Sequence, residues 1–271
     1  MHAADTIARH NVTISGEGPT LVFAHGFGCD QNMWKYVAPA FKATHRTVLF
    51  DHIGCGLSDY RAYDARRHAR IEGYAEDVNR MLRELDLRDV VFVGHSVSAM
   101  IGALATIAEP QRFAGLVMLG PSPRYINDPP HYHGGFERAD IDGLIDMMET
   151  NLIGWADFLT PVVMGEGHDP EVVEQLHSSL CSADAFITRR FAQAVFLGDN
   201  RADLPRISVP TLVVQVEHDA IAPVAVGEYV HRQIAGSSYR LIDGAGHCPH
   251  MTHPTQTIAL IREFLQERAL A

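Results

Sequence analysis

The sequence predicts an α/β fold built on a mostly parallel, doubly wound sheet. Short apolar runs bounded by turn residues recur along its 271 residues, and helical patterns lie between them. The runs are continuous rather than alternating, which is typical of parallel strands covered on both faces. Right-handed connections between such strands would place helices on both sides of the sheet.

Six apolar runs are the predicted strands. Each is short, rich in β-branched or aromatic residues, and bounded by turn signals. In chain order they are residues 20–24, 47–50, 90–94, 115–119, 210–216 and 239–242.

Two segments show the clearest helical periodicity, and a third, Ala-rich segment follows Ser96. In residues 73–87 one apolar stripe consists of Tyr74, Val78, Met81, Leu82 and Leu85. Near the C-terminus a second stripe consists of Thr257, Ile258, Ile261, Phe264 and Leu265.

One region departs from the alternation of strands and helices. From about Pro121 to Asn200 there is no strand-like run, only Pro- and Gly-rich turns followed by helical patterns. We expect a helical cap over the strand ends, because the segment is short for an independent domain with its own core. The predicted division is a core over 1–121 and 201–271, with the cap at 122–200.

Charge and composition exclude several partners. The chain has 22 Lys and Arg against 33 Asp and Glu, a formal charge of −11. This balance disfavours nucleic acid and anionic membrane surfaces, which bind through cationic side chains. No run of about 18 apolar residues and no apolar signal segment is present, so we expect a cytoplasmic protein.

Cysteines and histidines give no metal or disulfide pattern. Two disulfides are conceivable, but in a chain of this length without a signal we expect thiols at Cys29, Cys55, Cys181 and Cys248. The pairs His131/His133 and His247/His250 lack the ligand spacing of a zinc site. We therefore expect neither a metal nor another cofactor.

Reactive residue types follow the predicted strands. In an open parallel sheet, ligands bind beyond the carboxyl ends of the strands. The segments at those ends are "HGFG" (25–28), "DHIGCGLSD" (51–59), "GHSVS" (94–98), "EHD" (217–219) and "DGAGH" (243–247). The segment 51–59 contains a G-x-G pattern but lacks the third glycine of a dinucleotide-binding site. We therefore interpret this pattern as a structural turn.

Ser96 is the candidate nucleophile. A serine on a sharp strand-to-helix turn needs small neighbours, which Gly94 and, less well, Ser98 provide. The helix that starts at Val97 favours an anion near the serine. By itself the G-x-S-x-S pattern is weak evidence for a nucleophile. The reactive residue types at the other strand ends make this evidence strong.

His247 is the candidate base and Asp219 the candidate acid. A serine hydroxyl needs a base, and the base needs a partner that fixes its tautomer. Asp219 lies at the end of a buried strand. Glu217 and Asp243 are the alternatives: Glu217 lies within the strand or at its rim, and Asp243 is too close to His247 in sequence to reach around it easily. His95 adjoins the serine on the same turn and should point away. The order Ser, Asp, His is the one expected for a serine hydrolase on this type of sheet.

Two backbone amides are candidates for an oxyanion hole. Val97 directly follows the serine, and Phe27 lies in a glycine-flanked loop after the first predicted strand. Two such donors aimed at one point would stabilise the negative charge of a tetrahedral intermediate.

At these residues the chain resembles the α/β-hydrolase superfamily over essentially its full length. The strings "FAHGFGCDQNMW", "GHSVSAMIG", "GPSPRYINDPP", "GGFE" and "CPHMTHP" resemble bacterial stress-response regulators of the RsbQ type and the plant karrikin and strigolactone receptors. Ser98 agrees with the pattern of the plant receptors.

The resemblance implies a hydrolase fold with a four-helix, V-shaped cap over an apolar pocket. It implies the triad Ser96, His247 and Asp219, with Phe27 and Val97 as the oxyanion hole. It also implies that the pocket is lined by Tyr125, Phe136, Trp155, Phe158 and Phe196.

Two functions follow as expectations. The first is a cofactor-independent serine hydrolase of a small apolar ester or butenolide-like lactone. The second is a signalling module that binds or slowly hydrolyses such a ligand and engages a protein partner, which for RsbQ-like proteins is a sensor-domain phosphatase. A haloalkane dehalogenase would carry Asp at Ser96 and is disfavoured, whereas cofactor-free haloperoxidases and esterases share the triad.

Overall fold

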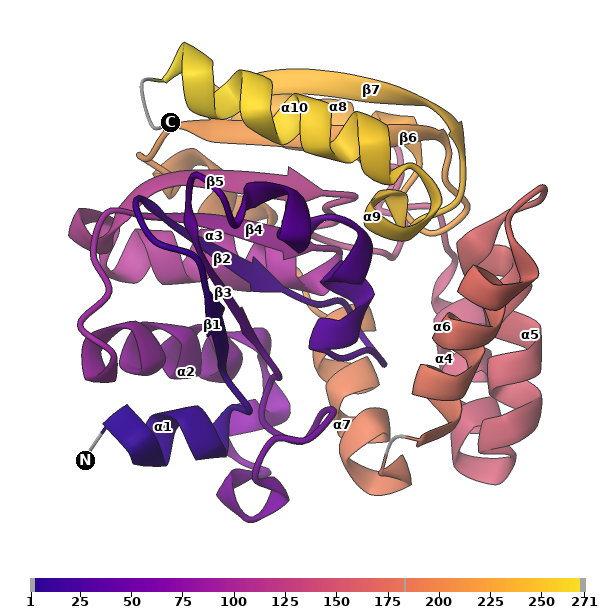
Figure 1. The fold of residues 1–271 in the computed structure, drawn as a ribbon. Coiled ribbons are helices and arrows are strands. Elements are labelled where there is room, and N and C mark those ends of the chain that lie inside the picture. Colours follow the sequence, from indigo (N-terminus) through magenta and orange to yellow (C-terminus); the bar gives the residue numbers. More distant parts are fainter. Residues whose placement is uncertain (1–2, 183, 269–271) are drawn as a thin grey trace.

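A seven-stranded sheet of order β1-β3-β2-β4-β5-β6-β7 forms the centre of the protein (Figure 1). The computed structural model describes residues 3–182 and 184–268. The strands are β1 (Thr13–Ser15), β2 (Thr20–Ala24), β3 (Arg46–Phe50), β4 (Val90–His95), β5 (Phe113–Leu119), β6 (Thr211–His218) and β7 (Ser238–Ala245). All neighbouring pairs are parallel except β1 and β3.

The predicted α/β fold and its six strands are confirmed. Strand β1 was not predicted, because its three residues are mostly exposed and too short to show a pattern. It pairs antiparallel with β3 at the edge of the sheet, so the sheet is mostly parallel.

Helices cover both faces of the sheet and one end of it. The α-helices are α1 (Ala3–Arg9), α2 (Ile71–Glu84), α3 (Val97–Ala108), α4 (Arg138–Thr150), α5 (Leu152–Met164), α6 (Pro170–Ser182), α7 (Ala185–Phe196), α8 (Val224–Gln233), α9 (Pro249–Thr252) and α10 (Pro254–Glu267). The two predicted apolar stripes lie on α2 and α10, with Leu85 as the C-terminal cap of α2.

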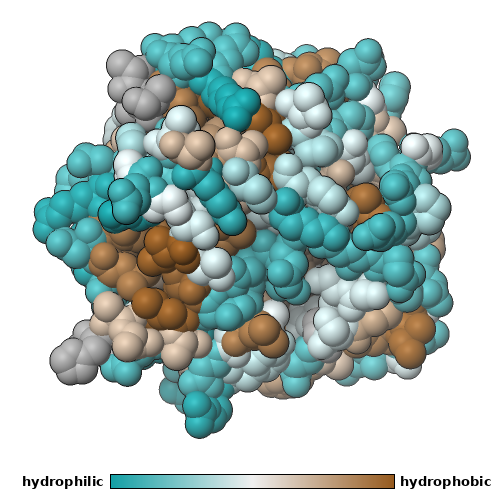
Figure 2. Space-filling model, viewed as in Figure 1, coloured by the Kyte–Doolittle hydropathy of each residue, from teal (hydrophilic) through white to brown (hydrophobic). Residues whose placement is uncertain are grey.

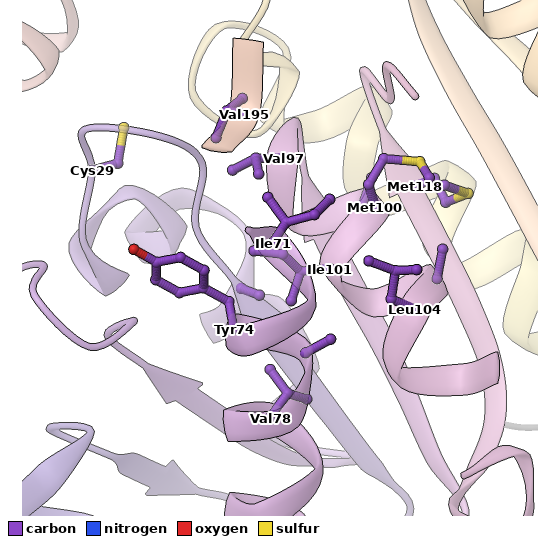
Figure 3. Packing of buried hydrophobic residues seen from close by; sticks show 14 of the residues in the cluster. Cys29, Ile71, Tyr74, Val78, Val97, Met100, Ile101, Leu104, Met118 and Val195 are labelled. Carbon is purple, nitrogen blue, oxygen red and sulfur yellow. The ribbon is translucent and has the colours of Figure 1, made fainter. Parts of the chain in front are cut away.

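Each central strand is buried on both faces, as its continuous apolar run requires. In β2, Val22 and Ala24 belong to the core layer under α2 and α3, while Leu21 and Phe23 belong to the layer under α10. Figure 3 shows part of the first layer: Ile71 and Val78 of α2 lie on the side of Ile101 in α3, and Met100 extends toward Met118 of β5. The Tyr74 ring points away from α3 and stacks on Phe191 of α7.

Helices α4–α7 lie in the chain between β5 and β6 and stand beyond the ends of the strands in Figure 1. This region contains no strand of the sheet among the described residues, as the sequence suggests. The exact division into core and cap at residues 121 and 200 stays a prediction.

The face shown in Figure 2 is largely hydrophilic, with separate apolar clusters rather than one continuous apolar surface. Within residues 3–182 and 184–268, no helix has the length and apolarity that crossing a membrane requires.

Candidate active site

Ser96 lies on a strained turn between β4 and α3. Its backbone has φ 55° and ψ −121°, a conformation that is rare for a residue with a side chain and typical of a nucleophile elbow. A Cβ on Gly94 would lie 2.3 Å from the carbonyl oxygen of Ser98, so only glycine fits there. The turn therefore presents the Ser96 hydroxyl at the carboxyl end of the sheet.

Ser96, His247 and Asp219 form one hydrogen-bonded chain. His247 Nε2 lies 2.8 Å from Ser96 Oγ, and His247 Nδ1 lies 2.7 Å from Asp219 Oδ2. All three side chains are buried, although they come from three separate strand ends. The structure thus brings together the residues that the sequence suggested for nucleophile, base and acid.

Asp219 is held by donors on both of its oxygens. The backbone N–H groups of Ile221 and Ala222 donate to Oδ1 at 2.8 and 3.0 Å. Gln215 Nε2 lies 3.2 Å from Oδ2, the oxygen that also faces His247. These donors fix the orientation of the carboxylate toward the imidazole.

The alternative acids and the adjacent histidine do not reach this chain. Glu217 and Asp243 are exposed on β6 and β7. His95 points away from the serine hydroxyl, and its Nε2 lies 2.8 Å from the carbonyl oxygen of His247. Burial lowers the pKa of His95 well below the usual value, so the ring donates to this carbonyl as a neutral imidazole and braces the His247 loop.

The amides predicted for the oxyanion hole are those of Phe27 and Val97. Among the described residues neither N–H donates a hydrogen bond to a backbone or side-chain acceptor. Val97 is the first residue of α3, where the helix dipole favours negative charge. The Phe27 ring contacts three rings of the helices beyond the sheet, those of Trp155, Phe191 and Phe196.

A mostly apolar cavity of about 40 Å³ opens beside Ser96. Core and cap contribute to its lining, which comprises Phe27, Cys29, His95, Ser96, Tyr125, Leu159, Val163, Leu176, Leu180, Val195, Phe196, Ile221, His247 and Cys248. Burial raises the pKa of the Cys248 thiol, so this group stays neutral.

The five predicted lining aromatics take three different places. Tyr125 and Phe196 line the cavity, whereas Trp155 is buried behind the Phe27 ring. Phe136 and Phe158 do not reach it, because they border a second hollow of about 540 Å³ between α4 and α5. There Phe158 is 52% exposed, since it lies on the outer side of its helix. The two hollows share Leu159 and Ile221.

Candidate metal ligands are not assembled. His131 and His133 are exposed, and His247 is engaged by Ser96 and Asp219. No group of three or more His, Cys, Asp or Glu among the described residues is placed to hold a metal ion. The four cysteines are free thiols.

Three supporting contacts were not predicted from the sequence. The Tyr125 hydroxyl lies 3.4 Å from Ser96 Oγ, and Gln215 contacts Asp219. The His247 backbone N–H donates to the carbonyl oxygen of Val163 in α5 at 2.7 Å. Of these contacts, only that of Gln215 could have been suspected from the sequence, because Gln215 is a polar residue inside an apolar strand. The other two contacts depend on how the cap packs against the core.

Comparison with known proteins agrees with this geometry. The alpha/beta hydrolase family model matches residues 21–260. The chain is 38% identical to a probable esterase from Oryza sativa subsp. japonica, over 95% of this chain and 96% of that protein. It is 38% identical to the karrikin insensitive 2 receptor CA of Petunia hybrida, over 93% and 94%. A solved hydrolase from Oleispira antarctica superposes with a TM-score of 0.96 at 40% identity, covering 98% of each chain.

The fold, the elbow and the family match define a hydrolase of the esterase type. The chain belongs to the alpha/beta hydrolase family and, within it, is close to the plant karrikin and strigolactone receptors.

Proposed function

We propose that the protein is a cofactor-independent serine hydrolase of a small apolar ester or lactone. The observation that carries this proposal is the buried chain Ser96–His247–Asp219 beside an apolar cavity. A small-molecule ligand is also supported by relatives that are named as esterases and as strigolactone or karrikin receptors.

Acylation begins when Ser96 Oγ attacks the ester carbonyl carbon and its proton passes to His247 Nε2. Asp219 stabilises the resulting imidazolium through His247 Nδ1. The carbonyl π electrons move onto the oxygen, which the amides of Phe27 and Val97 bind. Collapse of the intermediate breaks the bond to the alkoxy leaving group, which takes the proton from His247.

Deacylation repeats these steps with water. His247 removes a proton from water, hydroxide adds to the acyl carbon, and Ser96 leaves with the proton returned by His247. For a lactone the released alcohol and acid are parts of one molecule.

The size and polarity of the cavity support a small apolar acyl group. The space beside Ser96 is about 40 Å³ and its lining is mostly apolar, which favours a small apolar group over a large or charged one. The hollow between α4 and α5, with Phe136 and Phe158 at its border, would accommodate the remainder of a longer ligand.

The test compares wild type with Ser96→Ala on short aryl esters and butenolide lactones. We expect Ser96→Ala to lower turnover by at least about 10⁴-fold, because the residual rate comes from the oxyanion hole and binding alone. Intact-protein mass spectrometry should show an acyl adduct in wild type and none in the variant. Ser237→Ala, which lies in the turn before β7, is the matched control; near-normal turnover by Ser96→Ala would exclude the mechanism.

A signalling role is the second candidate, and the contact between cap and base favours it. Because the Val163 carbonyl accepts a hydrogen bond from the His247 backbone, movement of α5 on ligand binding would shift His247. A change at His247 would in turn shift α5. A sensor-domain phosphatase is the proposed partner. Ligand-dependent capture of such a phosphatase, with few turnovers and a lasting adduct on His247, would support this role; rapid multiple turnover without capture would oppose it.

A further inference from the structure

The Tyr125 hydroxyl is the polar group of the cavity for which the proposed hydrolysis gives no role. The side chain is 2% exposed and its ring packs against Phe196, with centroids 5.0 Å apart. The backbone is fixed as well: Phe136 N–H donates to the Tyr125 carbonyl at 3.2 Å, and Gly134 packs so closely that a Cβ would lie 2.4 Å from that oxygen. The hydroxyl is therefore held in one place.

This hydroxyl donates to the nucleophile. Ser96 has a single proton, which it donates to His247 Nε2, so Tyr125 must be the donor in the contact of 3.4 Å. That distance exceeds the roughly 2.7–2.8 Å of a strong hydroxyl hydrogen bond. The contact is weak, and a better acceptor in the cavity would displace it. Burial raises the pKa of Tyr125 to about 12, so the hydroxyl keeps its proton at neutral pH.

Few other donors reach the cavity. Among its described lining residues, only Ser96 and Tyr125 carry hydroxyl groups. Both ring nitrogens of His247 are engaged in the triad, and His95 Nε2 faces a backbone carbonyl. A second polar atom on a bound ester would find its donor in Tyr125.

Acylation removes the acceptor that Tyr125 has in the free enzyme. Once Ser96 Oγ is bonded to the acyl carbon, it becomes an ester oxygen and accepts hydrogen bonds less well. A buried donor without an acceptor costs free energy, so the transition state is favoured when the substrate itself supplies one.

We propose that Tyr125 is a specificity-determining residue that selects esters and lactones with a second acceptor oxygen near the reacting carbonyl. Its hydroxyl donates to that oxygen while Ser96 is acylated. The inference rests on the proposed serine hydrolase activity and names the substrate class of the same site.

The test compares Tyr125→Phe with wild type on two aryl esters of equal length, 4-nitrophenyl butyrate and 4-nitrophenyl methoxyacetate. These differ by one methylene replaced with an ether oxygen. We expect the variant to lower the ratio of kcat/KM for methoxyacetate to that for butyrate by about three- to tenfold. The intrinsic reactivities of the two esters cancel in this comparison between enzymes.

Tyr132→Phe is the matched control, because it removes another buried hydroxyl from the same loop, one that donates to the Arg124 carbonyl at 2.7 Å. It should leave the ratio unchanged. Serine-dependent turnover with a ratio within about twofold of wild type in Tyr125→Phe would overturn this inference alone. An equal loss on both esters would also overturn it, since the hydroxyl would then act on Ser96 and not on the substrate. No Ser96-dependent turnover of either ester would overturn the proposed function and this inference together.

Discussion

The sheet and helices α4–α7 hold their parts of the site in different ways. Strands β2 and β4 are buried along their entire length. By contrast, α6 buries only Leu176 and Leu180 of its 13 residues. Ser96 follows the fully buried strand β4, whereas much of the cavity wall belongs to the less buried helices. We therefore expect the proposed triad to keep its geometry while the shape of the cavity changes with the position of these helices.

A few contacts join the two regions. The Phe27 ring packs among aromatic rings of α5 and α7, and Ser179 of α6 donates to the Gly28 carbonyl at 3.1 Å. Both contacts reach the loop whose amide is proposed for the oxyanion hole. The position of the cap therefore bears directly on the geometry of the core site.

The largest expected effect concerns the contact between Asp219 and His247 at the ends of the strands. Asp219→Asn should lower kcat by about 10³- to 10⁴-fold while the fold is retained, because an amide no longer stabilises the imidazolium or fixes the His247 tautomer. Steady-state hydrolysis of an aryl ester and circular dichroism measure the two quantities. A decrease in kcat of less than about tenfold would mean that Asp219 does not stabilise the protonated His247.

The second prediction concerns acid stability, which the core should determine. Burial lowers the pKa of His10 to about 4 and that of His250 to about 3, and it lowers those of His52 and His95 well below the usual value. The unfolded chain binds protons at these sites near pH 6.5, but the folded chain does so only at lower pH. Stability is therefore complete above about pH 6.5 and falls as the pH drops toward 4, by on the order of 3 kcal/mol from His10 alone.

Urea unfolding at a series of pH values measures this slope. His10→Phe should flatten it, because a ring of similar size remains without the titrating group. The histidines between β5 and β6 are exposed or half-buried, and His131→Gln should leave the slope as in wild type. An unchanged slope in His10→Phe would contradict the prediction.

The smallest expected effect is the difference in stability between two leucine-to-alanine variants, one from each region. Leu116 in β5 is 0% exposed and Leu180 in α6 is 2% exposed. Leu116→Ala should lower the free energy of unfolding by about 2–5 kcal/mol, because it empties part of a close-packed layer. Leu180→Ala should cost less, about 1–2 kcal/mol, because its side chain borders an existing cavity and packs over Gly28. Chemical denaturation measures both.

Leu180→Ala should also raise kcat/KM for a hexanoate ester relative to an acetate ester, since the cavity becomes larger. If Leu116→Ala and Leu180→Ala lose equal stability and this ratio does not change, the sheet and helices α4–α7 do not differ in how tightly they are packed.

The sequence predicted the parts of the molecule that depend on local pattern. Continuous apolar runs gave the six strands, and the residues after them gave Ser96, His247 and Asp219 as neighbours, because parallel strands bring their carboxyl ends to one edge. Strand β1 was not predicted, since its three residues are mostly exposed and too few to show a periodicity.

The cavity depended on contacts that no local pattern encodes. Aromatic residues of the cap looked alike in sequence, yet Phe196 lines the cavity while Phe136 and Phe158 border another hollow. The contacts of Tyr125 with Ser96 and of Val163 with His247 arise only when a distant segment packs over the strand ends. The sequence by itself thus determined the sheet and the residues that follow its strands, because local periodicity and chain order set both. Only the tertiary structure decided the shape and polarity of the cavity, because these follow from side-chain packing between segments far apart in the chain.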